Sequence, residues 1–287
     1  MTAFNARYRQ GRITATGSLV YTNVTEHVKI GDAPADFQRL APSFTVSLQP
    51  WQEQLLFLRL MYKSTFRMPT FNDLYYYRLG NRSLRPEKAN EYNMGITWSR
   101  SFSSFLNYLS VTVDGYYNDV TDKIVAFPTT YAWKMANYGK VHVTGMDATL
   151  AAAASLGKNM VLVVSGGYTW QKAIDLTDAT SKSYKDQLPY TPKHSGNVSA
   201  VLEMPWVNVG YSIVGVSERY SMSQNIPENR IDGYMEHTVS LSRNFSFRHC
   251  KLRLQAEIIN LTDTQYDVIK YYPMPGRSWR LTGTIEF

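Results

Sequence analysis

Apolar and polar residues alternate along much of this chain. The last segment shows the pattern best: Trp279, Leu281 and Ile285 fall on one face, and Arg280 and Glu286 on the other. Residues 251–258, 109–118 and 12–21 repeat the same period of two. This period is typical of a β-strand with one apolar face, and helical spacing fits none of these segments. The pattern predicts an all-β chain, although a soluble sandwich would alternate in the same way.

The length of the predicted strands separates the two kinds of β-protein. We predict strands at 3–9, 12–22, 39–49, 53–65, 89–99, 105–119, 140–154, 159–172, 192–203, 206–218, 233–246, 250–261 and 277–287. Most have ten or more residues, whereas strands of soluble sheets most often have about five or six. A tilted strand needs about nine to eleven residues to cross a bilayer. Strand length therefore favours a membrane protein.

The connections between these strands alternate between short and long. Short ones are predicted at Gln10–Gly11, Pro50–Gln52, Arg100–Ser104, Ser155–Lys158, Met204–Pro205 and Arg248–His249, and long ones at 23–38, 66–88, 120–139, 173–191, 219–232 and 262–276. Outer-membrane barrels have this rhythm, with short periplasmic turns and long extracellular loops. We predict an antiparallel up-and-down transmembrane β-barrel that is partial, with about thirteen strands. Closed bacterial barrels have an even number of strands, so we expect a missing strand and a secretion signal upstream of Met1.

Composition agrees with a barrel and excludes other classes. Aromatic residues make up 14% of the chain, including 21 Tyr, which favours the boundary between lipid and water. No run of eighteen apolar residues exists, which excludes a transmembrane helix. The net charge is +7, but acidic and basic residues are interleaved, so we expect no nucleic-acid partner. Residues expected in an interfacial belt are Trp98, Trp170, Trp206 and Trp279.

The sequence contains no set of residues that predicts catalysis or metal binding. Motifs such as HExxH, GxSxG and a phosphate-binding loop are missing, and the five histidines are scattered. His237 falls on the apolar face of its strand, which favours a position at lipid-headgroup level over a metal ligand. Asp175, Asp178 and Asp186 lack calcium-loop spacing and are interpreted as a solvated loop. We therefore predict neither an enzyme, a cofactor nor a metal site.

Two segments carry a resemblance to a known family. The first holds a phenylalanine-arginine-x-proline element followed by an asparagine-x-x-leucine-x-proline-glutamate element, with matches at Phe66, Arg67, Pro69, Asn81, Leu84, Pro86 and Glu87. The second, residues 260–287, runs through a Pro-Gly-Arg loop to a last strand that ends in Phe287. Both resemble TonB-dependent receptors, as do residues 118–125 and 137–147.

This resemblance implies a 22-stranded barrel in the outer membrane of a Gram-negative bacterium. Residues 1–287 would be the C-terminal part of that barrel, with the plug domain and the first strands lying outside the chain. The implied partners are TonB, contacted through the missing N-terminal region, a small-molecule nutrient, outer-membrane lipid and, in some receptors, a surface lipoprotein. Phe287 would be the terminal aromatic residue that the barrel-assembly machinery recognises.

The resemblance also directs attention to the extracellular loops. Tyr75, Tyr76, Tyr77 and Arg78 follow the first motif, and these residues, with Arg67, Tyr271 and Tyr272, are candidates for gripping a ligand by stacking and bidentate hydrogen bonds. For Arg67 a structural role is favoured, and the tyrosines could equally pack within loops. Residues 70–80 hold no histidine, which disfavours haem and leaves ferric siderophores and cobalamin, with oligosaccharides or peptides behind them. A passive porin or another independently closed barrel is the alternative function.

Overall fold

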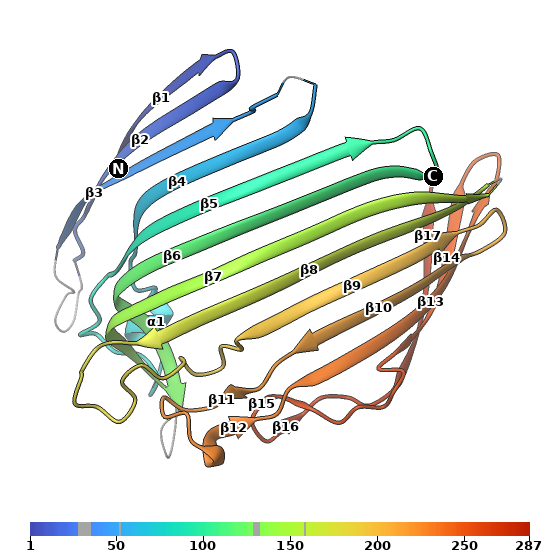
Figure 1. The fold of residues 1–287 in the computed structure, drawn as a ribbon. Coiled ribbons are helices and arrows are strands. Elements are labelled where there is room, and N and C mark those ends of the chain that lie inside the picture. Colours follow the sequence, from blue (N-terminus) through green and yellow to red (C-terminus); the bar gives the residue numbers. More distant parts are fainter. Residues whose placement is uncertain (28–35, 52, 129–132, 158) are drawn as a thin grey trace.

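The computed structural model describes residues 1–27, 36–51, 53–128, 133–157 and 159–287, and it forms one large curved sheet (Figure 1). Its thirteen antiparallel strands are β1 (Thr2–Gln10), β2 (Ile13–Val24), β3 (Phe37–Leu48), β4 (Leu55–Arg67), β5 (Glu87–Ser101), β6 (Leu106–Pro128), β7 (Trp133–Gly157), β8 (Met160–Asp175), β9 (His194–Glu203), β10 (Asn208–Val216), β13 (Tyr234–Ser246), β14 (Lys251–Ile259) and β17 (Ser278–Glu286). Each strand pairs with its neighbours in chain order. The predicted fold class and strand count are therefore confirmed.

Short turns gather at one end of the sheet and long connections at the other, which we call the short-turn end and the long-loop end (Figure 1). Predicted connections at residues 28–35, 52, 129–132 and 158 lie outside the described residues. The long connections contain short elements: helix α1 (Phe71–Tyr75), the 3-10 turn η1 (Pro227–Asn229), and strands β11 (Arg219–Tyr220), β12 (Arg230–Ile231), β15 (Asp267–Ile269) and β16 (Tyr272–Pro273). Among the described residues, no helix has the length and apolar character needed to cross a membrane.

The loop predicted at 120–139 is wrong in its described part. Strand β6 continues to Pro128 and β7 already begins at Trp133, so the two strands form a hairpin that extends beyond their neighbours. Two sets of contacts stabilise the extension. Its two strands pair with each other through backbone hydrogen bonds, and Ile124 and Met135 are buried against Leu74 and Leu84 of the β4–β5 connection. These contacts between distant segments were invisible in the local pattern.

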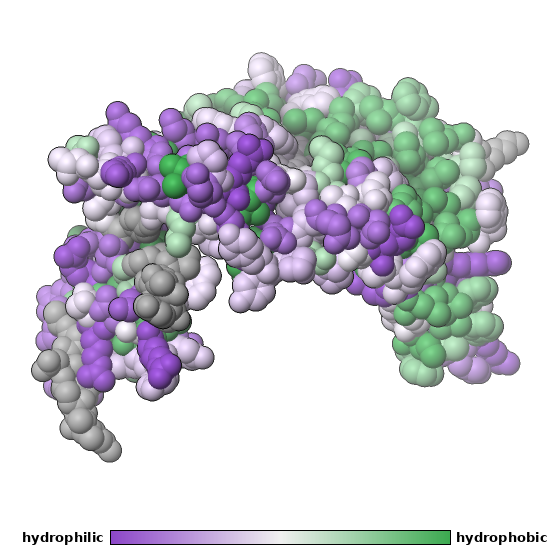
Figure 2. Space-filling model, turned by 90° about the horizontal axis from the view of Figure 1, so that it is seen from below, coloured by the Kyte–Doolittle hydropathy of each residue, from purple (hydrophilic) through white to green (hydrophobic). Residues whose placement is uncertain are grey.

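Strand register places the apolar residues on one face of the sheet. Leu58, Ile96, Val113 and Ala148 form a continuous row across β4, β5, β6 and β7. Figure 2 shows an arch around an open hollow, with hydrophobic residues over much of the outer surface of its right-hand side. Trp98, Trp170, Trp279 and His237 share this outward face by register, whereas Trp206 lies in the β9–β10 turn. An exposed apolar face of this extent suits contact with lipid.

The inward face is polar and cross-linked by side chains. Arg59 on β4 reaches Asp114 on β6, with Nη2 3.1 Å from Oδ1. Gly95 on the intervening strand makes this possible, because a Cβ there would lie 2.1 Å from the same carboxylate oxygen. Thr97 and Thr112 share a hydrogen bond of 3.0 Å on this face. A polar, hydrated interior and an apolar exterior are the arrangement expected of a membrane barrel.

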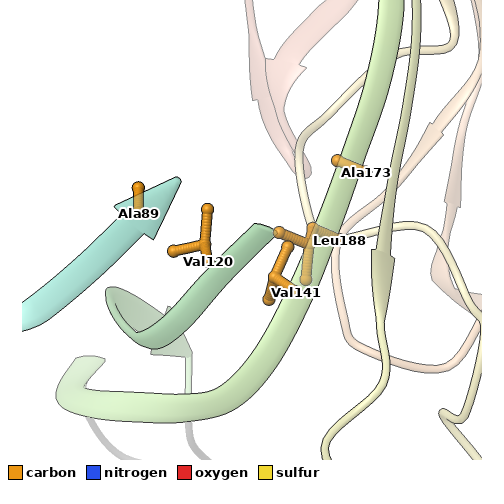
Figure 3. Close-up of a cluster of buried hydrophobic side chains, with 5 residues drawn as sticks. All are labelled: Ala89, Val120, Val141, Ala173 and Leu188. Atoms are coloured by element: carbon orange, nitrogen blue, oxygen red, sulfur yellow. The ribbon is translucent and has the colours of Figure 1, made fainter. Parts of the chain in front are cut away.

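A small apolar cluster lies on the inward face near the long-loop end. Ala89, Val120, Val141 and Ala173 come from four neighbouring strands, and Leu188 from the β8–β9 connection packs against them (Figure 3). Val141 is fully buried. The β8–β9 connection therefore folds inward over the sheet, and this positions the loop residues described next.

Candidate ligand-binding surface on the long loops

The first family motif ties the β4–β5 connection to the β6–β7 hairpin. Arg67 Nη1 lies 3.2 Å from Asp73 Oδ2, and its Nη2 donates to the backbone oxygen of Ile124 at 3.0 Å. The same Nη2 is 3.5 Å from Glu87 Oε2. One guanidinium thus joins α1, β5 and β6, a geometry that fits the structural role favoured for Arg67. Contact of this residue with a ligand stays a prediction.

The second motif makes a matching set of contacts. Asn81 Nδ2 donates to the backbone oxygen of Met135 at 3.1 Å. Leu84 is buried against Ile124, and Glu87 accepts a 3.0 Å hydrogen bond from the Ile124 amide. Pro69 and Pro86 lie in the same connection, and the Phe66 ring lies 4.9 Å from that of Phe37. In the structure, both motifs therefore hold a loop against a hairpin.

Asn137 completes this attachment from the β7 side. Its Nδ2 donates to the backbone oxygens of Arg85 at 3.0 Å and Asp122 at 2.6 Å, and its Oδ1 accepts from the Arg85 amide at 2.9 Å. The Arg85 guanidinium also pairs with the Asp122 carboxylate. We call the contacts of Arg67, Asn81, Arg85, Glu87 and Asn137 the loop clamp. It fixes the base from which Tyr76, Tyr77 and Arg78 project.

A second group of loops is tied together by buried polar residues. Gln187 is 3% exposed. Its backbone amide donates to Asn225 Oδ1 at 2.8 Å, and its backbone oxygen accepts from Asn225 Nδ2 at 3.0 Å. The Asp186 carboxylate accepts from the backbone amide of Asn225 at 2.9 Å. Asp175 is only 6% exposed and accepts from the Thr177 amide, so the interpretation of a solvated loop is wrong for this residue. The β8–β9 and β10–β13 connections therefore behave as one unit.

Arg219 links this unit to the β14–β17 connection. It is 4% exposed and donates to the backbone oxygens of Asp267 and Val268, the latter at 3.0 Å. Tyr234 stacks on Tyr266 with ring centroids 3.9 Å apart. The Tyr266 hydroxyl donates to Glu236 at 2.6 Å, and burial, followed by this carboxylate, raises the pKa of Tyr266 above its usual value. Neutral Tyr266 is thus preferred, because ionisation would place two anions together.

Three loop tips on these two units present an aromatic ring beside a cation. The pairs are Tyr77 with Arg78 (5.1 Å from guanidinium to ring centroid), Tyr184 with Lys185 (5.4 Å) and Tyr271 with Lys270 (5.4 Å). Each pair includes a residue with positive φ: Arg78 at 63°, Lys185 at 68° and Tyr271 at 68°. Such backbone is uncommon outside glycine and marks a sharp turn at each tip. We call these pairs the aromatic–cation tips.

The remaining predicted tyrosines occupy different environments. Tyr76 is exposed beside the first tip, and Tyr272 is exposed beside the third. Tyr75 is half-buried, packs against the Leu74 cluster and lies under the Arg82 guanidinium. The structure therefore brings Tyr76, Tyr77 and Arg78 to one surface and turns Tyr75 towards the apolar cluster around Leu74. Tyr271 and Tyr272 belong to a separate loop.

Sequence reasoning missed several residues of this surface. Tyr184, Lys185 and Lys270 were not singled out because no motif or alternation marks them. A polar hollow of about 330 Å³ between the β10–β13 and β14–β17 connections is lined in part by Arg230, Asp232, Asp267, Lys270 and Tyr271. Within the part of the chain that the structure describes, no cluster of three potential metal ligands occurs. The surface therefore offers rings, cations and hydrogen-bonding groups for a ligand.

A match to a family model now identifies the class of protein. Residues 4–261 match the model described as TonB dependent receptor-like, beta-barrel. Because the match covers most of the chain, the chain belongs to the family of TonB-dependent receptor β-barrels, which reside in the outer membrane of Gram-negative bacteria. Members of this family are receptors and transporters.

A curated relative matches most of the chain in sequence, and two solved structures share the fold over almost all of it. The vitamin B12 transporter BtuB of Photobacterium profundum is 26% identical over 230 residues, which are 77% of this chain and 34% of BtuB. The ferric citrate transporter FecA in its unliganded form matches with a TM-score of 0.77 at 15% identity, covering 98% of this chain and 44% of FecA. BauA, the ferric preacinetobactin receptor from Acinetobacter baumannii, matches with a TM-score of 0.71 at 13% identity, covering 99% and 42%. The chain thus spans about a third of the curated relative and under half of each solved structure.

Proposed function

We propose that this chain is the barrel portion of a receptor that captures a bulky, scarce nutrient and imports it with energy relayed by TonB. Ferric siderophores and cobalamin are the proposed ligand classes. The names of the relatives support both ligand classes, since they include a vitamin B12 transporter, a ferric citrate transporter and a ferric preacinetobactin receptor. TonB, the barrel-assembly machinery and a surface lipoprotein remain proposed partners of the whole protein. The proposal assigns no cofactor and no catalytic step to the chain.

The aromatic–cation tips carry this proposal. Tyr77 is 79% exposed and Tyr271 is 82% exposed, at the end of the sheet that faces outward in outer-membrane barrels. Large exposed rings are unfavourable in water and are typical of a surface that a ligand covers. A ring beside a cation suits a ligand that is both flat and anionic, because the ring stacks while the cation pairs with charge.

The positions of the tips favour a large ligand. They arise from three separate connections, two of which are tied together through Asn225 and Arg219 as described above. The loop clamp holds the third in place. Rings held on fixed bases lose little freedom on binding, so more of the contact energy appears as affinity.

A binding experiment on the purified receptor tests the proposal. We expect Arg78→Gln and Lys270→Gln each to weaken binding of an anionic ferric siderophore about fivefold, since an exposed cation near a ring contributes about 1 kcal/mol. Quenching of tyrosine and tryptophan fluorescence would measure Kd across a panel of iron complexes and cobalamin. Lys251→Gln, an exposed lysine at the short-turn end, is the matched control and should bind as the unmodified receptor does.

The same titrations distinguish the ligand classes. Raising the salt concentration should weaken binding of an anionic iron complex, because exposed charges are screened, but should leave uncharged cyanocobalamin almost unaffected. In the source bacterium, deleting the gene should abolish uptake of the complex that binds. The absence of binding and of any uptake defect across the panel would contradict the proposal.

A further inference from the structure

Three tyrosine–histidine pairs lie on the outward face of the sheet. Hydrogen bonds join Tyr117 Oη to His142 Nδ1 at 3.2 Å, Tyr168 to His194 at 2.7 Å, and Tyr211 to His237 at 2.8 Å. In each pair the two residues are diagonal neighbours on adjacent strands, as the strand registers show. Such a set on a lipid-facing surface is polar, and it needs a polar partner at that level of the membrane.

The three histidines differ in their surroundings. His142 Nε2 lies 3.2 Å from Asp119 Oδ1, so this imidazole has a carboxylate partner within the protein. Neither His194 nor His237 makes an ion pair with a carboxylate in the described part of the chain. His194 is also exposed, and its bond to Tyr168 uses Nδ1. Its Nε2 therefore remains available to a molecule outside the barrel.

An apolar groove lies beside His194. Gly196 and Gly215 are cross-strand partners on β9 and β10, and both belong to the outward face. Without side chains they form the floor of a groove of about 460 Å³, lined by Tyr168, His194, Val198, Ile213 and Met235 among others. There is room above Gly215, since a Cβ there would lie 3.7 Å from Met235 Cγ, an ordinary contact distance, whereas a Cβ on Gly196 would lie 2.9 Å from the backbone oxygen of Gly167. The groove can accept a hydrocarbon chain.

A lysine lies near the head of this groove. Trp170 is the cross-strand partner of His194, and Lys172 follows two positions later on the same outward face. Lys172 is exposed. Both residues lie towards the long-loop end, which in an outer-membrane barrel faces the outer leaflet. An apolar groove that leads to an imidazole and an ammonium group is complementary to an anionic lipid.

We propose that this surface binds one lipopolysaccharide molecule of the outer leaflet. One acyl chain lies over Gly196 and Gly215, and a phosphate on the sugar headgroup accepts hydrogen bonds from His194 and Lys172. Phosphate oxygens are strong acceptors, and charge-assisted bonds to them gain strength where lipid excludes water. Tyr168 orients the imidazole through Nδ1 and leaves Nε2 for the phosphate. The proposal rests on the outer-membrane location and not on the identity of the imported nutrient.

Native mass spectrometry of the intact receptor, extracted from outer membranes in mild detergent, tests this site. We expect His194→Gln and the groove-filling Gly215→Leu each to reduce the fraction of receptor that retains lipopolysaccharide about fivefold, the effect of losing roughly 1 kcal/mol. His142→Gln is the matched control, because its imidazole already has Asp119 as partner, and it should retain the lipid normally. Unchanged retention in both test variants would overturn the proposal.

Two further measurements separate lipid binding from its alternatives. Receptor in nanodiscs of phosphatidylglycerol should retain that lipid far less than receptor in nanodiscs containing lipopolysaccharide retains the glycolipid. Equal retention would overturn the choice of lipopolysaccharide. The heat-dependent gel mobility of each variant reports correct barrel folding, and His194→Gln decides the question if Gly215→Leu does not assemble. Nutrient binding should be unchanged in His194→Gln, so the outcome does not depend on the proposed function.

Discussion

At the scale of single residues, Tyr266 illustrates how the loops are joined. Its ring stacks on Tyr234, whose other neighbour is the buried guanidinium of Arg219, 5.7 Å away. Its hydroxyl bonds Glu236 at the beginning of β13. A single phenol therefore connects the β14–β17 connection to the sheet through both stacking and a charge-assisted hydrogen bond. Such bonds are among the stronger ones in proteins.

The ionisation of Tyr266 gives a pH-dependent test. Burial and Glu236 raise the pKa of Tyr266, so the folded state prefers the neutral phenol. This preference stabilises the loops fully below pH of about 10, where an unfolded tyrosine is still neutral. It is lost as the pH rises further towards the raised pKa. In an absorbance titration at 295 nm we expect Tyr266 to ionise later than the exposed tyrosines, and Tyr266→Phe should reduce the late component by one tyrosine. An unchanged titration curve in the variant would contradict the assignment.

At the scale of elements, the loop clamp explains why the β6–β7 hairpin stands as ordered strands. The hairpin bonds itself through β-pairing, and the β4–β5 connection covers Ile124 and Met135 with Leu74 and Leu84. Helix α1 begins with a capping box in which Thr70 and Asp73 satisfy each other's backbone amides. Asp73 also binds Arg67, so the start of the helix and the clamp are one structure. The hairpin and the connection should therefore loosen together.

Removal of Asn137 tests that coupling. Asn137→Ala eliminates two hydrogen bonds between the hairpin and the β4–β5 connection and a third within the hairpin, each contributing about 1 kcal/mol. We expect trypsin to cut after Arg78 or Arg82 at least about tenfold faster, because cleavage follows the population of locally opened loops. The barrel itself should keep its gel mobility. Asn72→Ala, on the exposed surface of α1, serves as control and should leave the cleavage rate unchanged.

The sequence predicted the strands better than the loops for a physical reason. In a two-faced sheet every second side chain meets lipid, so residues 278–286 show the alternation without knowledge of any partner. The β6–β7 extension and the inward packing of Leu188 depend on contacts between distant segments, which no local window contains. The local pattern was enough to place Tyr271 in a loop. It could not predict the ring–cation pair of Tyr184 and Lys185, because that pair forms only in the folded turn.

At the scale of the whole molecule, the two faces of the sheet face different surroundings. Neighbouring residues on one strand therefore respond differently to the same substitution. Leu150 on β7 lies in the outward row between Val111 and Gly166, whereas Thr149 lies on the inward face between Thr112 and Gly167. The inward face is wet and already carries charged pairs such as Arg59 with Asp114. An arginine should therefore cost little stability on the inward face and much more on the outward face.

The pair Leu150→Arg and Thr149→Arg measures that difference directly. We expect Leu150→Arg to lower the free energy of unfolding by about 2–4 kcal/mol, the cost of an arginine at the lipid-facing midplane of a barrel. Thr149→Arg should change it by less than about 1 kcal/mol, because the long side chain can extend into water beside Gly167. Urea titrations of the receptor in lipid vesicles, followed by tryptophan fluorescence, give both values. Equal losses in the two variants would mean that this sheet does not divide lipid from water, and the barrel assignment for β7 would then fail.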